Sequence, residues 1–131
     1  MWDAQKQVAE FHDKYGHPAS AELAVPKPEE VKLRIKLIEE EARETCDALD
    51  GLHTGLFSMT DVADGLADLA YVVLGTAVTL GIDLEHVFNE VHRSNMTKAV
   101  AVRLPGEKYA TGGGKGPGYT PPDLQRVLYG N

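Results

Sequence analysis

The chain has 131 residues, enough for one domain around a single hydrophobic core. Apolar residues make up 43% and charged residues 25%, a composition too apolar for a disordered chain. The net charge of −7 would repel a phosphate backbone, so nucleic acid is not an expected partner. A small phosphorylated ligand is compatible with this charge if a cation bridges it to the carboxylates.

The N-terminal stretch is charged throughout, unlike a secretory signal. The most apolar segment, 66–80, is shorter than the roughly 20 residues needed to cross a bilayer, and it contains Asp68. The single Cys46 cannot form an intrachain disulfide. We therefore expect a cytoplasmic protein with no membrane contact.

The first half of the chain predicts two helices. Apolar residues at 3–4 spacing indicate a helix from about Trp2 to Tyr15, ended by the glycine that follows. Pro28 and the two glutamates after it suit the first turn of a second helix. This helix carries apolar residues as far as Leu52 and should end before Gly55.

The third predicted helix is the most apolar one. Ser58 or Thr60 can cap its start, and Gly81 closes its end. From 66 to 80 it is apolar on nearly all sides, as expected of a helix in a core or between subunits. It therefore leaves surface to bury, which favours dimerisation.

Two further helices complete the prediction. Asp83 is a suitable N-cap for a fourth helix that continues to about Lys98. A short last helix is expected over Pro121–Leu128, capped by Thr120. No segment alternates with period two, so the fold class is all-α. We expect a four-helix bundle completed by dimerisation: a single domain, 1–131, with its core at about 1–100 and a loop-rich C-terminal tail at 101–131.

Carboxylates interrupt the apolar stripe of the second helix. At about 100° per residue, Glu41 and Glu44 point within about 40° of Leu37, and Glu40 within about 60°. Glu39 points the other way and should be solvated. Three glutamates therefore occupy positions where a core would place apolar residues.

The third helix repeats this pattern, because Asp61, Asp64 and Asp68 follow one another at spacings of three and four. Buried carboxylates are costly unless they are paired or bound to a metal. Arg34 and Arg43 are too few to pair with six acids. The alternatives are a solvated acidic face and an oxygen-rich site for a hard divalent ion, and Mg²⁺ characteristically combines a few carboxylates with substrate phosphates.

These residues carry a resemblance. Glu40-Glu41-x-x-Glu44, followed by an acidic cluster that ends at Asp68, resembles the E-E-x-x-E and E-x-x-D motifs of the MazG and phosphoribosyl-ATP pyrophosphohydrolase superfamily. Segment 81–98 resembles the fourth helix of MazG-like members. The Gly-Pro-Gly-Tyr-x-Pro-Pro-Asp stretch of the tail is similar to that of compact members.

The resemblance implies an all-α enzyme that hydrolyses an NTP or dNTP to the monophosphate and pyrophosphate, a house-cleaning activity for nucleotide pools. It implies Mg²⁺, or Mn²⁺ in its place, and a homodimer or a dimer of dimers. Glu41 would bind a second ion or act as the base towards water. The metal ligands that the resemblance implies are Glu40, Glu41, Glu44, Asp64 and Asp68.

One position departs from the family's pattern. Gly65 stands where the first glutamate of E-x-x-D is expected, and Asp64 is the obvious substitute because it lies one turn from Asp68. The shifted register Asp61-x-x-Asp64 also fits the pattern. We prefer Asp68, because the Leu-Ala-Tyr-Val-Val-Leu-Gly that follows fixes the alignment.

The resemblance also implies substrate contacts: Lys98 with the phosphates and Asn95 with the sugar or base. Arg93 and Lys115 are further phosphate candidates, and His12 is a candidate to reach the base. Lys98 could instead extend into solvent, since it lies near a helix end.

Two alternatives stay open. One is a phosphoribosyl-ATP pyrophosphohydrolase of histidine biosynthesis, although the fourth-helix and tail segments argue against it. The other is a catalytically idle helical dimer that binds nucleotides, which the departure at Gly65 keeps open. The sequence identifies neither the preferred base and sugar nor the number of metal ions.

Overall fold

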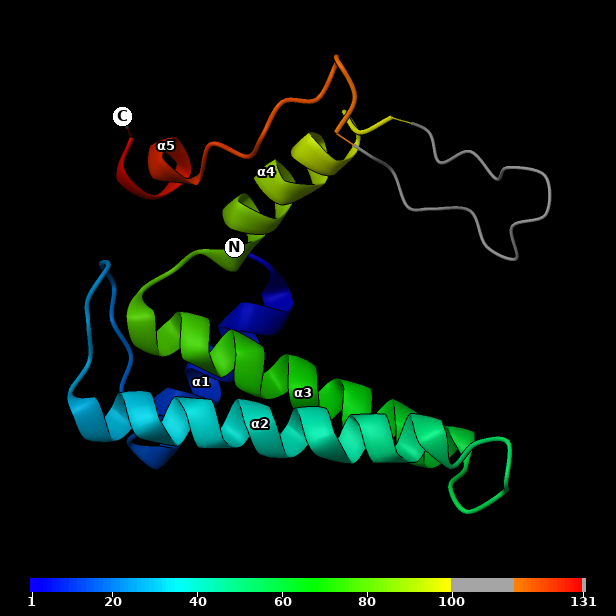
Figure 1. Cartoon of the computed structure of the whole chain (residues 1–131). Coiled ribbons are helices and arrows are strands. Elements are labelled where there is room, and N and C mark those ends of the chain that lie inside the picture. Colours follow the sequence, from blue (N-terminus) through cyan, green and yellow to red (C-terminus); the bar gives the residue numbers. More distant parts are fainter. Residues whose placement is uncertain (100–114, 131) are drawn as a thin grey trace, which may run out of the picture. The chain divides into compact units, whose positions relative to one another are not determined.

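The computed structural model describes residues 1–99 and 115–130. Every regular element within these ranges is a helix, so the all-α prediction is confirmed. By their internal contacts the residues group into two compact units, Met1–Leu84 and Glu85–Asn131. The helices are α1 (Asp3–Tyr15), α2 (Pro28–Asp50), α3 (Met59–Leu80), α4 (Leu84–Asn95) and α5 (Leu124–Tyr129) (Figure 1).

The first unit is built on α3. Helices α2 and α1 both pack against α3, and a short connection joins the end of α2 to the start of α3 (Figure 1). Buried Gln5 ties the end of the unit to α1, because its side-chain amide donates to the Ile82 carbonyl and accepts from the Leu84 amide, at 2.6 and 3.0 Å. The buried apolar side chains of this unit are Val8, Ala48, Val62, Ala77 and Val78.

Helices α2 and α3 approach closely at Gly65. A Cβ atom there would lie 2.9 Å from Thr45 Oγ1 and 3.2 Å from Thr45 Cα. The Thr45 hydroxyl donates to the Glu41 carbonyl at 2.7 Å, which holds it against its own helix. A glutamate at position 65 would therefore have to push the two helices apart.

Both ends of α3 are capped as the sequence predicts. Ser58, and not Thr60, is the N-cap, and it forms a reciprocal capping box with Asp61. Gly81 closes the helix in the left-handed conformation, with φ of 72°. A side chain there would also collide with the carbonyl of Glu22, so both backbone conformation and space require glycine.

Three predicted boundaries are wrong. Helix α2 ends at Asp50, so Leu52 lies outside it. Helix α4 ends at Asn95, and Lys98 follows in a tightened turn in which the Thr97 hydroxyl donates to the Ser94 carbonyl at 2.7 Å.

The last helix begins at Leu124 and not at Pro121. Its cap is Asp123, whose carboxylate accepts from the Arg126 amide at 3.1 Å, instead of Thr120. The physical reason is Pro122, whose ring disfavours helical backbone at the residue before it. Thr120 is therefore left for contacts with α4.

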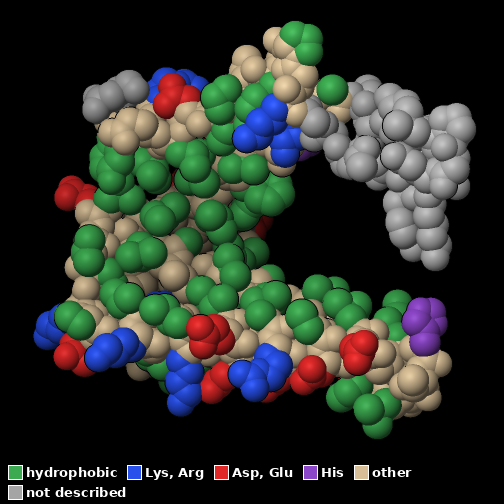
Figure 2. Space-filling view, viewed as in Figure 1, with side chains coloured by type: hydrophobic (Ala, Val, Ile, Leu, Met, Phe, Trp, Pro, Cys, Tyr) green, Lys and Arg blue, Asp and Glu red, His purple; other side chains and the backbone are tan. Residues whose placement is uncertain are grey.

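Helix α3 is long and apolar enough, by length and composition alone, to span a membrane. The core helix of a soluble protein passes the same test. Its first half carries three aspartates, which a lipid-facing helix would expose at high cost. On the neighbouring α2, acidic and basic side chains alternate along the outer edge (Figure 2).

Candidate metal and active site

A pocket of about 260 Å³ lies between the second half of α2 and the first half of α3. Three predicted metal ligands, Glu44, Asp64 and Asp68, line it together. The sequence did not single out Asp47 or Phe57 as part of it, although Asp47 lies one residue from Ala48 and one turn beyond Glu44. The complete lining is Glu44, Asp47, Ala48, Phe57, Asp61, Asp64, Gly65 and Asp68.

Glu41 lies one turn before Glu44 on α2 and is half-buried. Its Oε2 atom is buried and has no hydrogen-bond partner among the described residues. Burial raises the pKa of the Glu41 carboxyl, and the negative charges of Glu44, Asp68 and Glu40 raise it further. Each of the charged neighbours that shift this pKa is another carboxylate, so negative charge is concentrated around Glu41.

The chemistry of this donor set fits a hard divalent cation. Carboxylate oxygens from two facing helices are the ligands that Mg²⁺ uses, and an unpartnered buried oxygen such as Glu41 Oε2 gains most from a cation. Within the described ranges, however, no three Asp, Glu, His or Cys side chains are already grouped to hold one ion. The carboxylates would have to close around it, with water and phosphate oxygens completing the shell.

Glu40 lies at the margin of this cluster. Its side chain is 52% exposed, and its Oε1 atom is 3.9 Å from Lys36 Nζ, one turn earlier on α2. Glu39 is exposed as well, as its position on the helix predicts. The structure thus separates Glu41 and Glu44, which face α3, from Glu39 and Glu40, which face solvent.

Asp61 is part of the pocket wall and also has a structural role. Its Oδ2 atom accepts from the Ser58 amide at 2.7 Å and from the Ser58 hydroxyl at 3.0 Å. These hydrogen bonds lower the pKa of Asp61. The sequence-based expectation that Asp61 acts mainly at the start of its helix agrees with this geometry.

Two basic or imidazole side chains of the first unit, Arg34 and His12, are buried. Arg34 is buried on α2, with its Nε atom 3.6 Å from Glu30 Oε1. His12 is only 3% exposed, and its Nδ1 lies 2.8 Å from the Pro18 carbonyl, which can only accept, so Nδ1 donates. Burial lowers the pKa of His12. His12 therefore contributes to packing between helices, and its contact with a base stays a prediction.

The other predicted substrate residues belong to the second unit. Asn95 is the last residue of α4 and is exposed, as are Lys98 and Lys115. The Arg93 guanidinium is already engaged, because it donates to Glu90, Thr120 and Pro121. Its role towards phosphate stays a prediction.

Comparison with known proteins agrees with these motifs. The chain is 35% identical over 83 residues to an uncharacterized protein of Acanthamoeba polyphaga mimivirus. That alignment covers 60% of this chain and 31% of the viral protein, so the chain spans about a third of that relative's length.

The model of the phosphoribosyl-ATP pyrophosphohydrolase family matches residues 8–95, well over half of the chain. The matched range includes α2, α3 and the whole acidic pocket between them. The chain therefore belongs to the phosphoribosyl-ATP pyrophosphohydrolase family, within the MazG-like all-α superfamily of NTP pyrophosphohydrolases.

Proposed function

We propose that this protein is a Mg²⁺-dependent pyrophosphohydrolase that converts an NTP or dNTP to the monophosphate and pyrophosphate. Family membership indicates a hydrolase of the pyrophosphohydrolase type. The observation that supports the metal and the site is Glu41, with its unpartnered buried oxygen among carboxylates that raise its pKa. A cation would relieve this charge and attract a triphosphate that the bare cluster repels.

In this proposal Glu44, Asp64 and Asp68 hold the cation, with Glu40 at the margin. When bound, Mg²⁺ neutralises phosphate charge and stabilises the leaving pyrophosphate. A water molecule attacks the α-phosphorus, and the bond to the bridging oxygen of the β-phosphate breaks. Glu41 either binds a second ion or accepts the proton of that water.

Phosphoribosyl-ATP is a second candidate substrate, because the family model that matches the chain carries that name. Its hydrolysis also releases pyrophosphate, so the same carboxylates would serve. The two candidates differ in what surrounds the base and sugar. Turnover of phosphoribosyl-ATP, measured beside a panel of NTPs and dNTPs, separates them.

We also propose that the active form contains at least two copies of the chain, in the cytoplasm. Apolar side chains of α3 are exposed in the single chain, with Leu66 at 52%, Tyr71 at 40% and Val73 at 37%. Burial of such a surface would stabilise a homodimer or a dimer of dimers. Light scattering after size exclusion measures the number of copies.

The deciding experiment is an assay for pyrophosphate with each nucleotide, with Mg²⁺, with Mn²⁺ and with a chelator. We expect metal-dependent release from at least one NTP, dNTP or phosphoribosyl-ATP, and loss of that release in Glu41→Gln. Nucleotide binding without any pyrophosphate release would favour the idle helical dimer instead. It would leave the family assignment standing and remove the proposed activity.

A further inference from the structure

The close approach of α2 to α3 occurs beside the acidic pocket. Gly65 lines this pocket together with Asp64 and Asp68. On the facing helix, Thr45 directly follows Glu44, which lines the pocket as well. Both Gly65 and Thr45 are buried. A tight contact between the two helices therefore lies next to the carboxylates that would share an ion.

The acids that α3 contributes to the pocket are aspartates, whose side chains are one methylene group shorter than that of glutamate. A shorter side chain can share an ion with α2 only if the two helices lie close together. Gly65 permits this approach because it has no Cβ atom. A Cβ atom there would lie 2.9 Å from Thr45 Oγ1 and 3.2 Å from Thr45 Cα. Both distances are shorter than an ordinary non-bonded contact between carbon atoms, which is about 3.5–4.0 Å.

Thr45 has little freedom to make room for a side chain at position 65. It is only 4% exposed, and its hydroxyl donates to the Glu41 carbonyl at 2.7 Å. Its Cα atom belongs to the backbone of α2 and can move only with that helix. A shift of α2 at Thr45 would carry the adjacent Glu44 away from α3. The contact between Gly65 and Thr45 therefore sets how far apart the carboxylates of the two helices lie.

We propose that Gly65 and Thr45 are positioning residues for the metal ion. Their contact sets the span between Glu44 on α2 and the two aspartates on α3, so that these carboxylates can share one ion of the size of Mg²⁺. Position 65 thus contributes a shorter distance between the helices in place of a carboxylate. The inference rests on the proposed function for the identity of the site, but it concerns binding of the ion, which can be measured without a nucleotide.

Gly65→Glu separates this inference from the simple loss of a ligand. If Gly65 were only a missing ligand, the added carboxylate would strengthen binding of Mg²⁺. The close contact with Thr45 predicts the opposite, because the new Cβ atom would force α2 and α3 apart. We expect Gly65→Glu to weaken Mg²⁺ binding about tenfold or more, as measured by calorimetry with Mg²⁺ alone. Tighter binding of Mg²⁺ by the folded variant would overturn the inference.

Gly65→Ala is the milder variant, and it keeps the test open if Gly65→Glu does not fold. Its matched control is Gly75→Ala on the same helix, where a Cβ atom would lie 2.7 Å from Arg34 Nη1, at the end of a flexible side chain. Gly75 lies outside the lining of the acidic pocket. We expect Gly65→Ala to weaken Mg²⁺ binding about tenfold and Gly75→Ala to bind Mg²⁺ as wild type does. Equal losses in the two variants would overturn the inference.

The size of the ion provides a readout that a loss of stability alone would not change. Oxygen ligands lie at about 2.0–2.1 Å from Mg²⁺ and at about 2.3–2.6 Å from Ca²⁺, so a wider span should disfavour the smaller ion more. Gly65→Ala should therefore lower the ratio of Mg²⁺ affinity to Ca²⁺ affinity about threefold or more. An unchanged ratio would overturn the inference.

A compensating change on α2 tests the contact itself. Thr45→Ala removes the hydroxyl that would lie 2.9 Å from the new Cβ atom, but it leaves Thr45 Cα at 3.2 Å. Gly65→Ala combined with Thr45→Ala should therefore recover part of the Mg²⁺ affinity and part of the preference for Mg²⁺ over Ca²⁺. A double variant that binds Mg²⁺ no better than Gly65→Ala alone would contradict the inference.

These measurements of ion binding separate the inference from the proposed function. If no nucleotide is hydrolysed but Gly65→Ala weakens Mg²⁺ binding and Gly75→Ala does not, the proposed function fails and the positioning role stands. If nucleotides are hydrolysed and Gly65→Ala binds Mg²⁺ as tightly as wild type, only the positioning role fails. A wild-type protein that binds no Mg²⁺ in the absence of nucleotide would overturn the positioning role, whatever the nucleotide assay shows.

Discussion

Two glutamates on different helices show how the same side chain is used in opposite ways. Glu90 on α4 is 7% exposed, yet hydrogen bonds from Arg93 and from the Asp123 amide lower its pKa to about 2. Glu41 on α2 is half-buried, and burial together with neighbouring carboxylates raises its pKa. The protein satisfies the first charge with its own donors and leaves the second without them.

The difference separates structural from functional acids within one chain. A carboxylate whose oxygens are all engaged stabilises the fold and has little capacity left for a ligand. A carboxylate with an unpartnered oxygen costs stability in the empty protein and gains most when a cation arrives. Replacing the carboxylate by a neutral amide should therefore lower stability at Glu90 and should not lower it at Glu41.

The largest effect is expected at the acidic pocket. Glu41→Gln should lower the rate of pyrophosphate release about 100-fold or more, because a base or metal-positioning group is lost. The metal-free variant should melt at the same temperature as wild type or higher, since the amide carries no charge. A rate assay and thermal unfolding check both, with Glu39→Gln as the exposed control, and equal losses in the two variants would remove the distinction between the faces of α2.

The aspartates of α3 sharpen the comparison within the pocket. Asp64→Asn and Asp68→Asn should each weaken the magnesium dependence severely, because both side chains line the pocket one turn apart. Asp61→Asn should cost stability more than activity, since Asp61 accepts hydrogen bonds from Ser58. Magnesium titrations of the three variants decide this. A crippled Asp61→Asn beside a near-normal Asp68→Asn would move the site towards the start of α3.

Binding of Mg²⁺ should also raise the free energy of unfolding. Mg²⁺ at about 100 times its dissociation constant should stabilise the wild-type protein by about 2.7 kcal/mol. Glu44→Gln should abolish most of that gain, whereas Glu90→Gln should keep it, because the Glu90 carboxylate is already engaged by Arg93 and the Asp123 amide. Thermal unfolding with and without Mg²⁺ measures the shift, and an equal shift in Glu44→Gln would place the ion elsewhere.

The smallest expected effect is on the stability of the protein at acidic pH. The folded pKa of Glu90 lies below the usual value of 4.5, so its contribution to stability is present above that pH and is lost as the pH falls towards about 2. Glu90→Gln should flatten the pH dependence of unfolding in this window. Denaturant unfolding between pH 5 and pH 2 provides the comparison, and an unchanged slope would mean that the unfolded chain keeps a similar interaction.

The sequence predicted the helices well because local signals define them. Apolar patterns together with prolines, glycines and candidate caps indicated all five, and Ser58 and Gly81 marked the ends of α3. It also predicted the facing acids Glu44, Asp64 and Asp68, since helical angles follow from residue number. The end of α4 was misplaced because Thr97 turns its hydroxyl back to the helix, a choice that residue type does not reveal.

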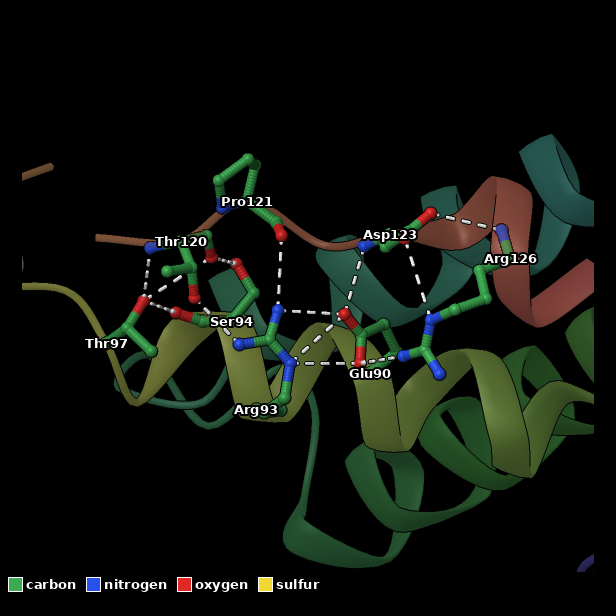
Figure 3. A network of polar contacts seen from close by, with 8 residues as sticks. All are labelled: Glu90, Arg93, Ser94, Thr97, Thr120, Pro121, Asp123 and Arg126. Atoms are coloured by element: carbon green, nitrogen blue, oxygen red, sulfur yellow. Dashed lines mark hydrogen bonds and ion pairs between the residues drawn. The ribbon is translucent and has the colours of Figure 1, made fainter. Parts of the chain in front are cut away.

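The polar network around Glu90 (Figure 3) could not be predicted, because the hydrogen bonds that hold Thr120 and Asp123 to α4 join residues 23–33 positions apart. The polar spacing of Glu90, Ser94 and Thr97 on one face of α4 was the signal available. Sequence reasoning instead assigned Arg93 to a phosphate, which is the common expectation for an arginine near a nucleotide motif. Likewise, the role of Gly65 depends on Thr45, which lies on another helix.

Because α2 and α3 approach closely there, the Thr45 side chain occupies the space that a side chain at position 65 would need. In any lineage of this chain, a larger side chain at position 65 requires a smaller side chain at position 45 and also a small separation of the two helices, because its Cβ atom would lie 3.2 Å from Thr45 Cα. Substitutions at the two sites should therefore occur in a fixed order, with the space opened before it is filled. The acids at 64 and 68 are free of this constraint, so the pocket can change its ligands there while the crossing of α2 and α3 stays the same.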